Sequence, residues 1–380
     1  MKIPFNRQPI LETSVEYIIE SLNNQSSGDG KFTKKCSEWL EAKVDVSRAL
    51  LTTSGSHALD MSAILCNVCH GDEVIMPSFT FSSTANAFVG RGAKVVFIDI
   101  KPDTMNLDEN LIEDAITAKT RVIVPMHYAG VSCEMDKINE IAKKYNLFVV
   151  EDAAHGIMSE YKGIPLGALG DFGCFSFHET KNFSMGEGGA LLITHKNNIL
   201  EAEIMREKGT NRSQFFRGEV DKYSWIDWGS SYLPSELNAA YLWSQLEVAD
   251  KITETRLKIW EQYYAELTPL AEKGYIELPY VPHYCKHNAH MFYFKVSDSS
   301  TQMNLIHYLK SEGIYAVFHY VPLHSAKAGV KYGRFHGVDK FTTKESERLI
   351  RLPMYYALNE DEVSTIVRNI NRFFTTREVN

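Results

Sequence analysis

The sequence lacks the features of exported, membrane-spanning and nucleic-acid-binding proteins. Its 380 residues include only 6 cysteines, which are scattered without the spacing of a disulfide framework, and the start Met1-Lys2-Ile3-Pro4 has no export signal. No apolar run approaches the length needed to cross a bilayer. The net charge of -8 provides no positive field for nucleic acid or an anionic membrane. We therefore expect a cytoplasmic protein that binds neither.

Two cysteine and histidine patterns resemble haem or metal sites. The run Cys66 to His70 has the Cys-x-x-Cys-His spacing of c-type haem attachment. Haem proteins of that kind are exported, however, and these cysteines end a predicted apolar helix over 58–68. His283, His287 and His290 cluster near prolines, without the carboxylates or thiolates of a known metal class. We expect no haem and no metal site.

From residue 48 to about residue 195, short β-branched runs alternate with helix-length segments. This alternation predicts a parallel sheet with crossover helices. The predicted strands are 49–52, 74–76, 94–98, 122–124, 147–150, 174–177 and 190–193. The segment 134–145 carries apolar residues at helical spacing and charges on its other side, which predicts an amphipathic helix over one face of the sheet.

The remainder of the chain predicts a second, smaller lobe. The helix-rich segment 234–273 would bridge to it. In the lobe itself, strands are predicted at 291–296 and 316–320, and helices at 303–311 and 360–374. Because 380 residues exceed one ordinary core, we expect an α/β protein with a large domain over 1–245 and a small α+β domain over 246–380.

A single lysine stands where a buried strand gives way to a glycine-rich turn. The run 172–177 alternates with small residues like a buried strand, Lys181 follows it, and the glycines of 186–189 relieve the turn into the next apolar run. Lys181 would then face a cavity at a strand end, where a lysine can hold an aldehyde cofactor as a Schiff base. The alternative is an exposed loop lysine, as most lysines are.

Other predicted strands deliver compatible groups to the same edge, where ligands of open parallel sheets collect. The first strand leads into Ser54-Gly55-Ser56-His57 and then a helix, whose free N–H groups and dipole favour phosphate. The second leads to Phe81, whose ring could stack on a flat heterocycle. An ordinary helix cap and a core aromatic are the simpler alternatives.

Asp152 follows the all-apolar strand 147–150. A carboxylate there is costly to bury unless it meets a cation or a donor. A protonated pyridine nitrogen would be such a partner, and the pairing would keep the ring electron-poor. The alternative is a helix cap for the residues that follow. A shared site is favoured because six candidates occur in order along the strands: Ser56, Phe81, Asp152, His155, Ser176 and Lys181.

These motifs resemble those of a known family. The stretches 151–155, 175–182 and 186–189 are similar to the signatures of the DegT/DnrJ/EryC1 sugar aminotransferases, and the likeness runs from Pro4-Phe5 to Leu352-Pro353-Met354-Tyr355. The resemblance implies the fold type I of transferases that use pyridoxal 5′-phosphate (PLP). Such a fold has a mostly parallel central sheet with helices on both faces and a smaller C-terminal α+β lobe.

The resemblance also implies roles for individual residues. Lys181 would bind PLP covalently and then move protons as a base, Asp152 would pair with the pyridine nitrogen, and His155 would lie near the ring hydroxyl, where many relatives have Gln. The other implied cofactor contacts are Phe81 on the ring and Ser176 with the N–H groups of Ser56 and His57 on the phosphate. Relatives often reach that phosphate with an Asn of the neighbouring subunit, because their active sites are shared across a homodimer. Here Ser231 could substitute for the Asn, or the contact could be absent.

Within the family, the stretches 177–189, 206–218 and 318–324 resemble members that act on dTDP-sugars. They imply transfer of an amino group from L-glutamate to C4 of dTDP-4-keto-6-deoxy-D-glucose. The product would be dTDP-4-amino-4,6-dideoxy-D-galactose for surface polysaccharides such as lipopolysaccharide or enterobacterial common antigen. Two alternatives keep the same chemistry: the product is the gluco epimer, or the substrate is another keto sugar nucleotide. Two others do not: a PLP-dependent sugar dehydratase, in which family members have His at the position of Lys181, and a non-catalytic PLP-binding regulator.

Substrate contacts are expected from two further segments. Lys208, Asn211, Arg212 and Arg217 could bind the nucleotide diphosphate in an otherwise acidic protein, or could form a solvated basic loop. His319 and His324 could contact the sugar or only pack.

Overall fold

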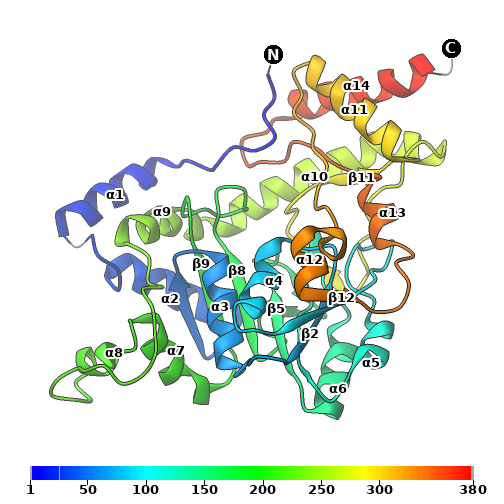
Figure 1. The fold of residues 1–380 in the computed structure, drawn as a ribbon. Coiled ribbons are helices and arrows are strands. Elements are labelled where there is room, and N and C mark those ends of the chain that lie inside the picture. The colour runs from blue at the N-terminus through cyan, green and yellow to red at the C-terminus, as the bar shows by residue number, and fades with distance from the viewer. Residues whose placement is uncertain (1, 25, 378–380) are drawn as a thin grey trace.

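A central sheet of eight strands organises the protein, whose computed structural model describes residues 2–24 and 26–377 (Figure 1). The strand order is β1-β9-β8-β5-β4-β2-β3-β12. The bounds are β1 (Arg48–Thr52), β2 (Glu73–Pro77), β3 (Lys94–Ile98), β4 (Thr120–Ile123), β5 (Phe148–Asp152), β8 (Phe172–Ser176), β9 (Gly189–Ile193) and β12 (Gly333–Phe335).

The sheet is mostly parallel. Each pair from β12 through β3, β2, β4 and β5 to β8 is parallel, whereas β9 is antiparallel to both β8 and β1. Strand β9 therefore runs against the others, and the carboxyl ends of β1, β2, β5 and β8 lie at one edge. Ligands of such sheets bind at this edge.

Helices cover both faces of the sheet, which explains why its strands read as continuous apolar runs. Along β9, Leu191 and Ile193 pack with α3 (Gly55–Leu65), α4 (Ser82–Val89) and α7 (Ile199–Arg206). The alternate residues Ala190 and Leu192 pack with α2 (Lys31–Val44) and α9 (Glu236–Leu246) on the other face. Farther along that face, Ile75 of β2 and Val149 of β5 pack with α6 (Met135–Tyr145).

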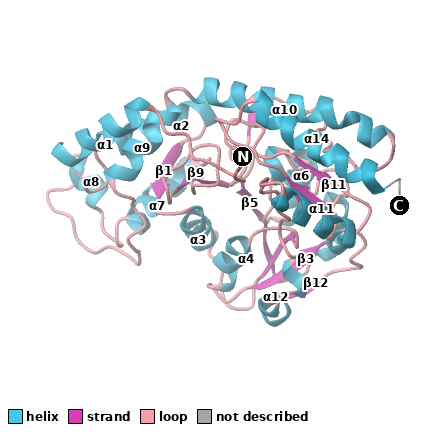
Figure 2. Ribbon diagram, turned by 90° about the horizontal axis from the view of Figure 1, so that it is seen from above, coloured by secondary structure: helices cyan, strands magenta, loops and turns pink. Residues whose placement is uncertain are grey.

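A second hydrophobic core lies in the C-terminal part of the chain. It joins α10 (Ala249–Glu272), α11 (Ser299–Ser311) and α14 (Glu360–Arg377) to a two-stranded antiparallel sheet of β11 (Tyr293–Lys295) and β13 (Leu349–Arg351). Helices α1 (Glu12–Asn24), α9, α2, α10 and α14 follow one another along one side of the molecule in Figure 2. The long α10 thus connects the two cores.

Short elements complete the fold. The helices are α5 (Ile112–Ala115), α8 (Arg212–Phe216), α12 (Lys327–Tyr332) and α13 (Thr342–Ser346), with 3-10 turns at Glu109–Leu111, Tyr128–Gly130, Lys196–Asn198 and Leu323–Ser325. A three-stranded sheet consists of β10 (Cys285–Lys286), β6 (Glu160–Tyr161) and β7 (Ile164–Pro165).

The predicted fold class is confirmed, and one predicted strand is wrong. Residues 316–320 make only the isolated bridge Val317 to Arg351 instead of a strand, because His319 and Tyr320 form part of a cavity wall. The predicted helix 58–68 is α3, which begins earlier, at Gly55, where the Ser54 side chain caps it, and ends at Leu65. The division into domains 1–245 and 246–380 stays a prediction.

Candidate active site

Lys181 lies in the turn after β8, and its side chain lines a cavity of about 810 Å³. The turn is closed by backbone hydrogen bonds from Phe177 N to Gly188 O at 2.8 Å and from Lys181 N to His178 O at 2.9 Å. A side chain at position 188 would collide with Met185, so the turn requires glycine there. The glycine-rich segment therefore fixes the direction of Lys181.

The cavity lies between the sheet edge and the C-terminal lobe. Residues after β1, β2, β5 and β8 line one side, and the segments 317–320 and 351–354 line the other. Its volume is in the range typical of sites that hold a cofactor or small ligand.

The Lys181 amine has an environment suited to nucleophilic chemistry. Burial lowers its pKa to about 8, the nearby charge of Arg351 also lowers it, and Asp152 acts in the opposite direction. A lysine with a pKa near 8 is partly neutral at physiological pH, as an amine that attacks an aldehyde or accepts a proton must be.

Asp152 ends β5 and is 3% exposed. Its Oδ2 accepts a hydrogen bond from Thr84 Oγ1 at 2.6 Å, and its Oδ1 accepts one from Ala154 N at 3.2 Å. The second bond closes a turn, and the helix cap weighed from the sequence is not formed, because residues 153–159 contain no helix. Because an ionised carboxylate offers about four lone-pair directions, Asp152 can bond to Ala154 and still accept a bond from a protonated ring nitrogen in the cavity.

The start of α3 forms a cradle of small polar groups in the cavity wall. Ser56 Oγ lies 2.6 Å from Ser83 Oγ of α4, and Ser176 at the end of β8 lines the same wall. A Cβ at Gly55 would lie 2.9 Å from the Ser176 Cβ, so glycine allows the helix start to approach the strand end. The N–H groups of Gly55 and Ser56 are among the first of the helix and have no partner within it, so they can bind a phosphate.

His57 is a correction to the predicted phosphate contacts. Its backbone N–H donates to Ser54 Oγ at 3.1 Å, and its ring contacts Thr53 and packs 5.1 Å from the Tyr232 ring. The helix cap therefore occupies the donor that the sequence assigned to phosphate.

His155 belongs to a stack of buried imidazoles beside Lys181. Its ring stacks on His290 with centroids 4.1 Å apart, and His319 lies 6.2 Å away on a nearly parallel plane. Burial, followed by the charge of Lys181, lowers the pKa of His155 well below its ordinary value, so the ring is neutral. Its Nδ1 accepts from Ala129 N at 3.3 Å, which places the proton on Nε2. Nε2–H can therefore donate to a ring oxygen in the cavity.

Phe81 is available for stacking. Its side chain is 58% exposed although it lines the cavity, and its ring lies 6.2 Å from that of Tyr320. The core-aromatic alternative does not hold for Phe81. It does hold for Phe79 two residues earlier, which is 1% exposed.

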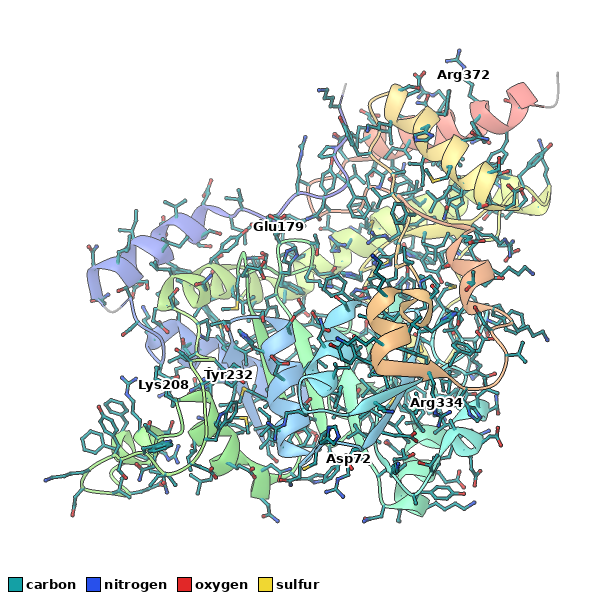
Figure 3. The ribbon with its side chains drawn as sticks, viewed as in Figure 1. Asp72, Glu179, Lys208, Tyr232, Arg334 and Arg372 are labelled. Atoms are coloured by element: carbon teal, nitrogen blue, oxygen red, sulfur yellow. The ribbon has the colours of Figure 1, made fainter. Side chains whose placement is uncertain are left out.

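Most predicted substrate cations lie away from the cavity of their own chain. Figure 3 shows Lys208 near α8, far from Glu179, which is two residues from Lys181. Arg217 is paired with Glu203 at 2.8 Å, and Arg212 lies 3.5 Å from Glu207. Asn211 Oδ1 accepts from Ser224 N at 2.8 Å and shapes the same loop.

Of the three remaining residues predicted to contact cofactor or substrate, one lines the cavity and two do not. His319 lines the cavity, with its Nδ1 2.7 Å from the Tyr128 hydroxyl. His324 does not line it and bonds to Ser78 at 2.7 Å and Asp339 at 3.2 Å, as in the packing alternative. Ser231 is exposed and bridges to Glu207, also outside the cavity. Its predicted contact with the phosphate would need a second copy of the chain.

The structure assigns other surroundings to the histidines weighed as metal ligands. His287 packs 4.5 Å from the Trp260 ring, and His283 packs against Tyr284, while His290 bonds to Asn182 in the cavity wall. Among residues 2–24 and 26–377, no group of three or more His, Cys, Asp or Glu side chains could hold a metal ion.

Several cavity residues were missed from the sequence. Ser83 and Thr84 lie two and three residues after Phe81 and could have been found from their hydroxyls. Tyr320 and Arg351 could not, because each comes from the C-terminal lobe and reaches the site only through tertiary packing.

The site as a whole fits PLP. Lys181 offers the amine for the aldehyde, Asp152 a buried anion for the pyridinium, His155 a donor for the ring oxygen and the start of α3 a binding place for the phosphate. When bound, PLP supplies an electron sink that lets a substrate C–H bond break. The fold and the site thus define a PLP-dependent transferase of fold type I.

Comparison with known proteins gives the family. The profile of the DegT/DnrJ/EryC1/StrS aminotransferase family matches residues 9–371. An uncharacterised protein of Methanocaldococcus jannaschii is 32% identical to this chain, and the alignment covers 97% of each protein. The UDP-4-amino-4-deoxy-L-arabinose–oxoglutarate aminotransferase of Shewanella sediminis is 29% identical, and that alignment also covers 97% of each protein. The chain belongs to this family, and it is a PLP-dependent sugar aminotransferase.

A solved structure supports the same conclusion. The PLP form of a Streptococcus pneumoniae protein assigned as a sugar aminotransferase superposes with a TM-score of 0.86, at 25% identity over 97% of both chains.

Among the residues that the structure describes, no helix is long and apolar enough to span a membrane.

Proposed function

We propose that the protein transfers the amino group of L-glutamate to C4 of dTDP-4-keto-6-deoxy-D-glucose and forms dTDP-4-amino-4,6-dideoxy-D-galactose. The observation that carries the amino transfer is the single cavity in which Lys181, Asp152 and His155 meet. The sugar assignment is supported by the stretches 177–189, 206–218 and 318–324, which resemble members that act on dTDP-sugars.

The residues of the chain would share the work. Asp152 would hold the cofactor ring by its nitrogen, and Phe81 would pack on the ring face. The Lys181 amine, with its pKa near 8, would carry a proton from the donor α-carbon and later deliver one to sugar C4. His319 and Tyr320 line the opposite wall and could contact the sugar.

Product analysis tests the substrate and the configuration together. The purified protein is incubated with L-glutamate and either dTDP-4-keto-6-deoxy-D-glucose or its UDP counterpart, and the product is analysed by NMR. We expect the dTDP-sugar to be aminated and the proton couplings at C4 to be small, as an axial amine requires. Large couplings would identify the gluco epimer, and amination of only the UDP-sugar would overturn the nucleotide assignment.

A further inference from the structure

The N-terminal segment 3–9, here called the strap, connects the two lobes and forms part of the cavity wall. At one end, Ile3 is 1% exposed within the core of the C-terminal lobe. At the other end, a tyrosine hydroxyl of α9 donates to Pro9 O at 3.1 Å. Between these anchors, Phe5 and Asn6 line the cavity that holds the lysine. The strap thus runs from the C-terminal lobe toward α1 (Figure 1).

The strap also holds the turn that carries Lys181. Asn6 Nδ2 donates to the main-chain oxygen of Glu179 at 2.8 Å, and Gln8 Nε2 donates to Glu179 Oε2 at 3.0 Å. Glu179 stands two residues before Lys181, and Figure 3 shows it beside the segment that precedes α1. The partners are 173 and 171 residues apart in the sequence, so only the tertiary fold brings them together.

On its other side, Lys181 is held by the protein interior. Asn182 Nδ2 donates to Asn288 O at 3.0 Å, and Asn182 Oδ1 accepts from the His290 ring at 2.9 Å. Asn182 is 2% exposed, whereas Glu179 is exposed. The main chain after Lys181 is therefore fixed by buried contacts, and the main chain before it is held from outside the turn by the strap.

The residues of the strap suit this task. Pro4 and Pro9 each fix a φ angle, so ordering the segment costs less conformational entropy than ordering a chain without prolines. Gln8 Oε1 accepts from the Tyr241 hydroxyl at 3.0 Å, which orients the amide group that reaches Glu179. Because the acceptor on Glu179 is a carboxylate, this bond is charge-assisted.

The position of the turn matters for the reaction. The Lys181 amine has to reach the donor α-carbon and later the sugar carbon, and small displacements of reacting atoms lower reaction rates strongly. Asn6 bonds to the backbone of Glu179 and not to its side chain. A shift of that carbonyl moves the main chain that leads directly to Lys181.

We propose that Asn6 is a positioning residue, which acts through the Glu179 carbonyl to hold the Lys181 amine in place for proton transfer. The inference rests on the role proposed for Lys181 and not on the identity of the sugar. It assigns a function in the reaction to a segment that is remote in sequence from the strand ends of the sheet.

Hydrogen exchange of the cofactor-free protein tests the contact itself. The amides of Lys181 and Met185 close the turn through backbone hydrogen bonds. In Asn6→Ala these amides should exchange about 2- to 10-fold faster, the effect of one lost hydrogen bond on a local opening. Asn6→Asp keeps the size of the side chain but cannot donate to a carbonyl, so it should behave like Asn6→Ala.

The reaction with L-glutamate alone tests the consequence. When the PLP-loaded protein is mixed with L-glutamate, loss of the visible band gives a maximal rate and a half-saturating concentration. In both Asn6 variants the maximal rate should fall about 2- to 10-fold, the worth of the same hydrogen bond. The half-saturating concentration should not change, because Asn6 holds the lysine and not the donor.

Asn371→Ala is the matched control. Asn371 is half-buried like Asn6, and its Nδ2 also donates to a main-chain oxygen, that of Val367 at 3.0 Å within α14. This variant should equal the wild type in the exchange of segment 177–188 and in the reaction with L-glutamate.

A double-mutant cycle tests the second contact of the strap. Gln8→Ala and Glu179→Ala each remove the same pair of side chains, so the double variant should react with L-glutamate no more slowly than the slower single variant. Losses that add would show that the two side chains act separately, against the arrangement proposed for the strap.

Three results would overturn the inference. The first is a wild-type maximal rate with wild-type exchange in both Asn6 variants. The second is a higher half-saturating concentration at an unchanged maximal rate, which would make Asn6 a donor contact. The third is a wild-type rate in Asn6→Asp alone, since Asp cannot donate to the Glu179 carbonyl. Failure of the sugar assignment is distinguishable, because the reaction with L-glutamate needs no sugar.

Discussion

At the scale of single residues, Lys181 depends on the charges around it. Burial and Arg351 lower the pKa of its amine, and Asp152 raises it, with a result of about 8. The amine is thus neutral at a lower pH than an exposed lysine, whose pKa is about 10.4.

This balance gives a pH dependence. Without cofactor, the protein should take up PLP with a rate that rises through pH 8, because only the neutral amine attacks the aldehyde. Arg351→Gln removes a cause that lowers the pKa, so the inflection should move to higher pH, and Asp152→Asn should move it to lower pH. Stopped-flow absorbance of PLP uptake measures all three. An inflection near that of free lysine, or shifts of the opposite sign, would contradict this interpretation.

The sequence predicted the residues near strand ends better than those from the distant lobe. Ser56, Phe81, Asp152, His155, Ser176 and Lys181 line one cavity because each follows a strand of the same sheet. Arg351 stands between Ile350 and Leu352, a context that is indistinguishable in sequence from that of a surface arginine. Its role depends on the packing of two lobes, which no local pattern contains.

At the scale of elements, the start of α3 positions the phosphate cradle. Ser54 caps the helix, Gly55 allows it to approach β8, and Ser56 meets Ser83 of α4. Strands were predictable because burial on both faces makes each an apolar run. The predicted strand at 316–320 was wrong because its apolar residues serve a cavity wall instead of a ladder.

Ser56→Ala tests the cradle. Loss of one hydroxyl that contacts the phosphate should weaken PLP binding roughly 10- to 100-fold, as for a hydrogen bond to a charged group. Equilibrium dialysis of PLP gives the affinity. Ser82→Ala, at the exposed first residue of α4, is the matched control and should bind PLP like the wild type. Equal affinities for both variants would show that the Ser56 hydroxyl makes no contact with the phosphate.

The imidazole stack should make the protein sensitive to acid. Burial keeps the pKa values of His155, His290 and His319 well below 6.5. Below that pH the unfolded chain binds protons that the folded chain does not, so the free energy of unfolding falls as pH decreases, by up to about 1.4 kcal/mol per pH unit for each histidine.

His155→Gln should reduce this slope, and His70→Gln, at an exposed position, should not. Urea denaturation at pH 7 and at pH 5.5 provides the comparison. A wild-type protein whose stability is equal at both values would show that the stack contributes nothing.

At the scale of the whole molecule, the cavity lies between two hydrophobic cores. Some of the residues predicted to contact substrate lie outside this cavity. Lys208, Arg212, Arg217 and Ser231 are outside the cavity of their own chain. If they bind substrate, they do so in the cavity of a second copy, as the family resemblance implies for a homodimer.

Complementation tests the shared site. Lys181→Ala and Arg212→Ala variants should each be impaired, and refolding them together should restore part of the activity, because a mixed dimer has one site with both residues intact. Activity is measured as 2-oxoglutarate release and mass by light scattering. If the mixture stays as impaired as its components, Arg212 either acts in the active site of its own chain or has no role in the reaction.

The most direct test of the central claim is the visible spectrum and turnover of Lys181→Ala. We predict that the variant folds, shows no visible band of covalently held PLP and releases no 2-oxoglutarate from L-glutamate and the keto sugar. Lys119→Ala, an exposed control, should match the wild type in both respects. Wild-type turnover by Lys181→Ala would contradict the assignment of Lys181 and the mechanism built on it.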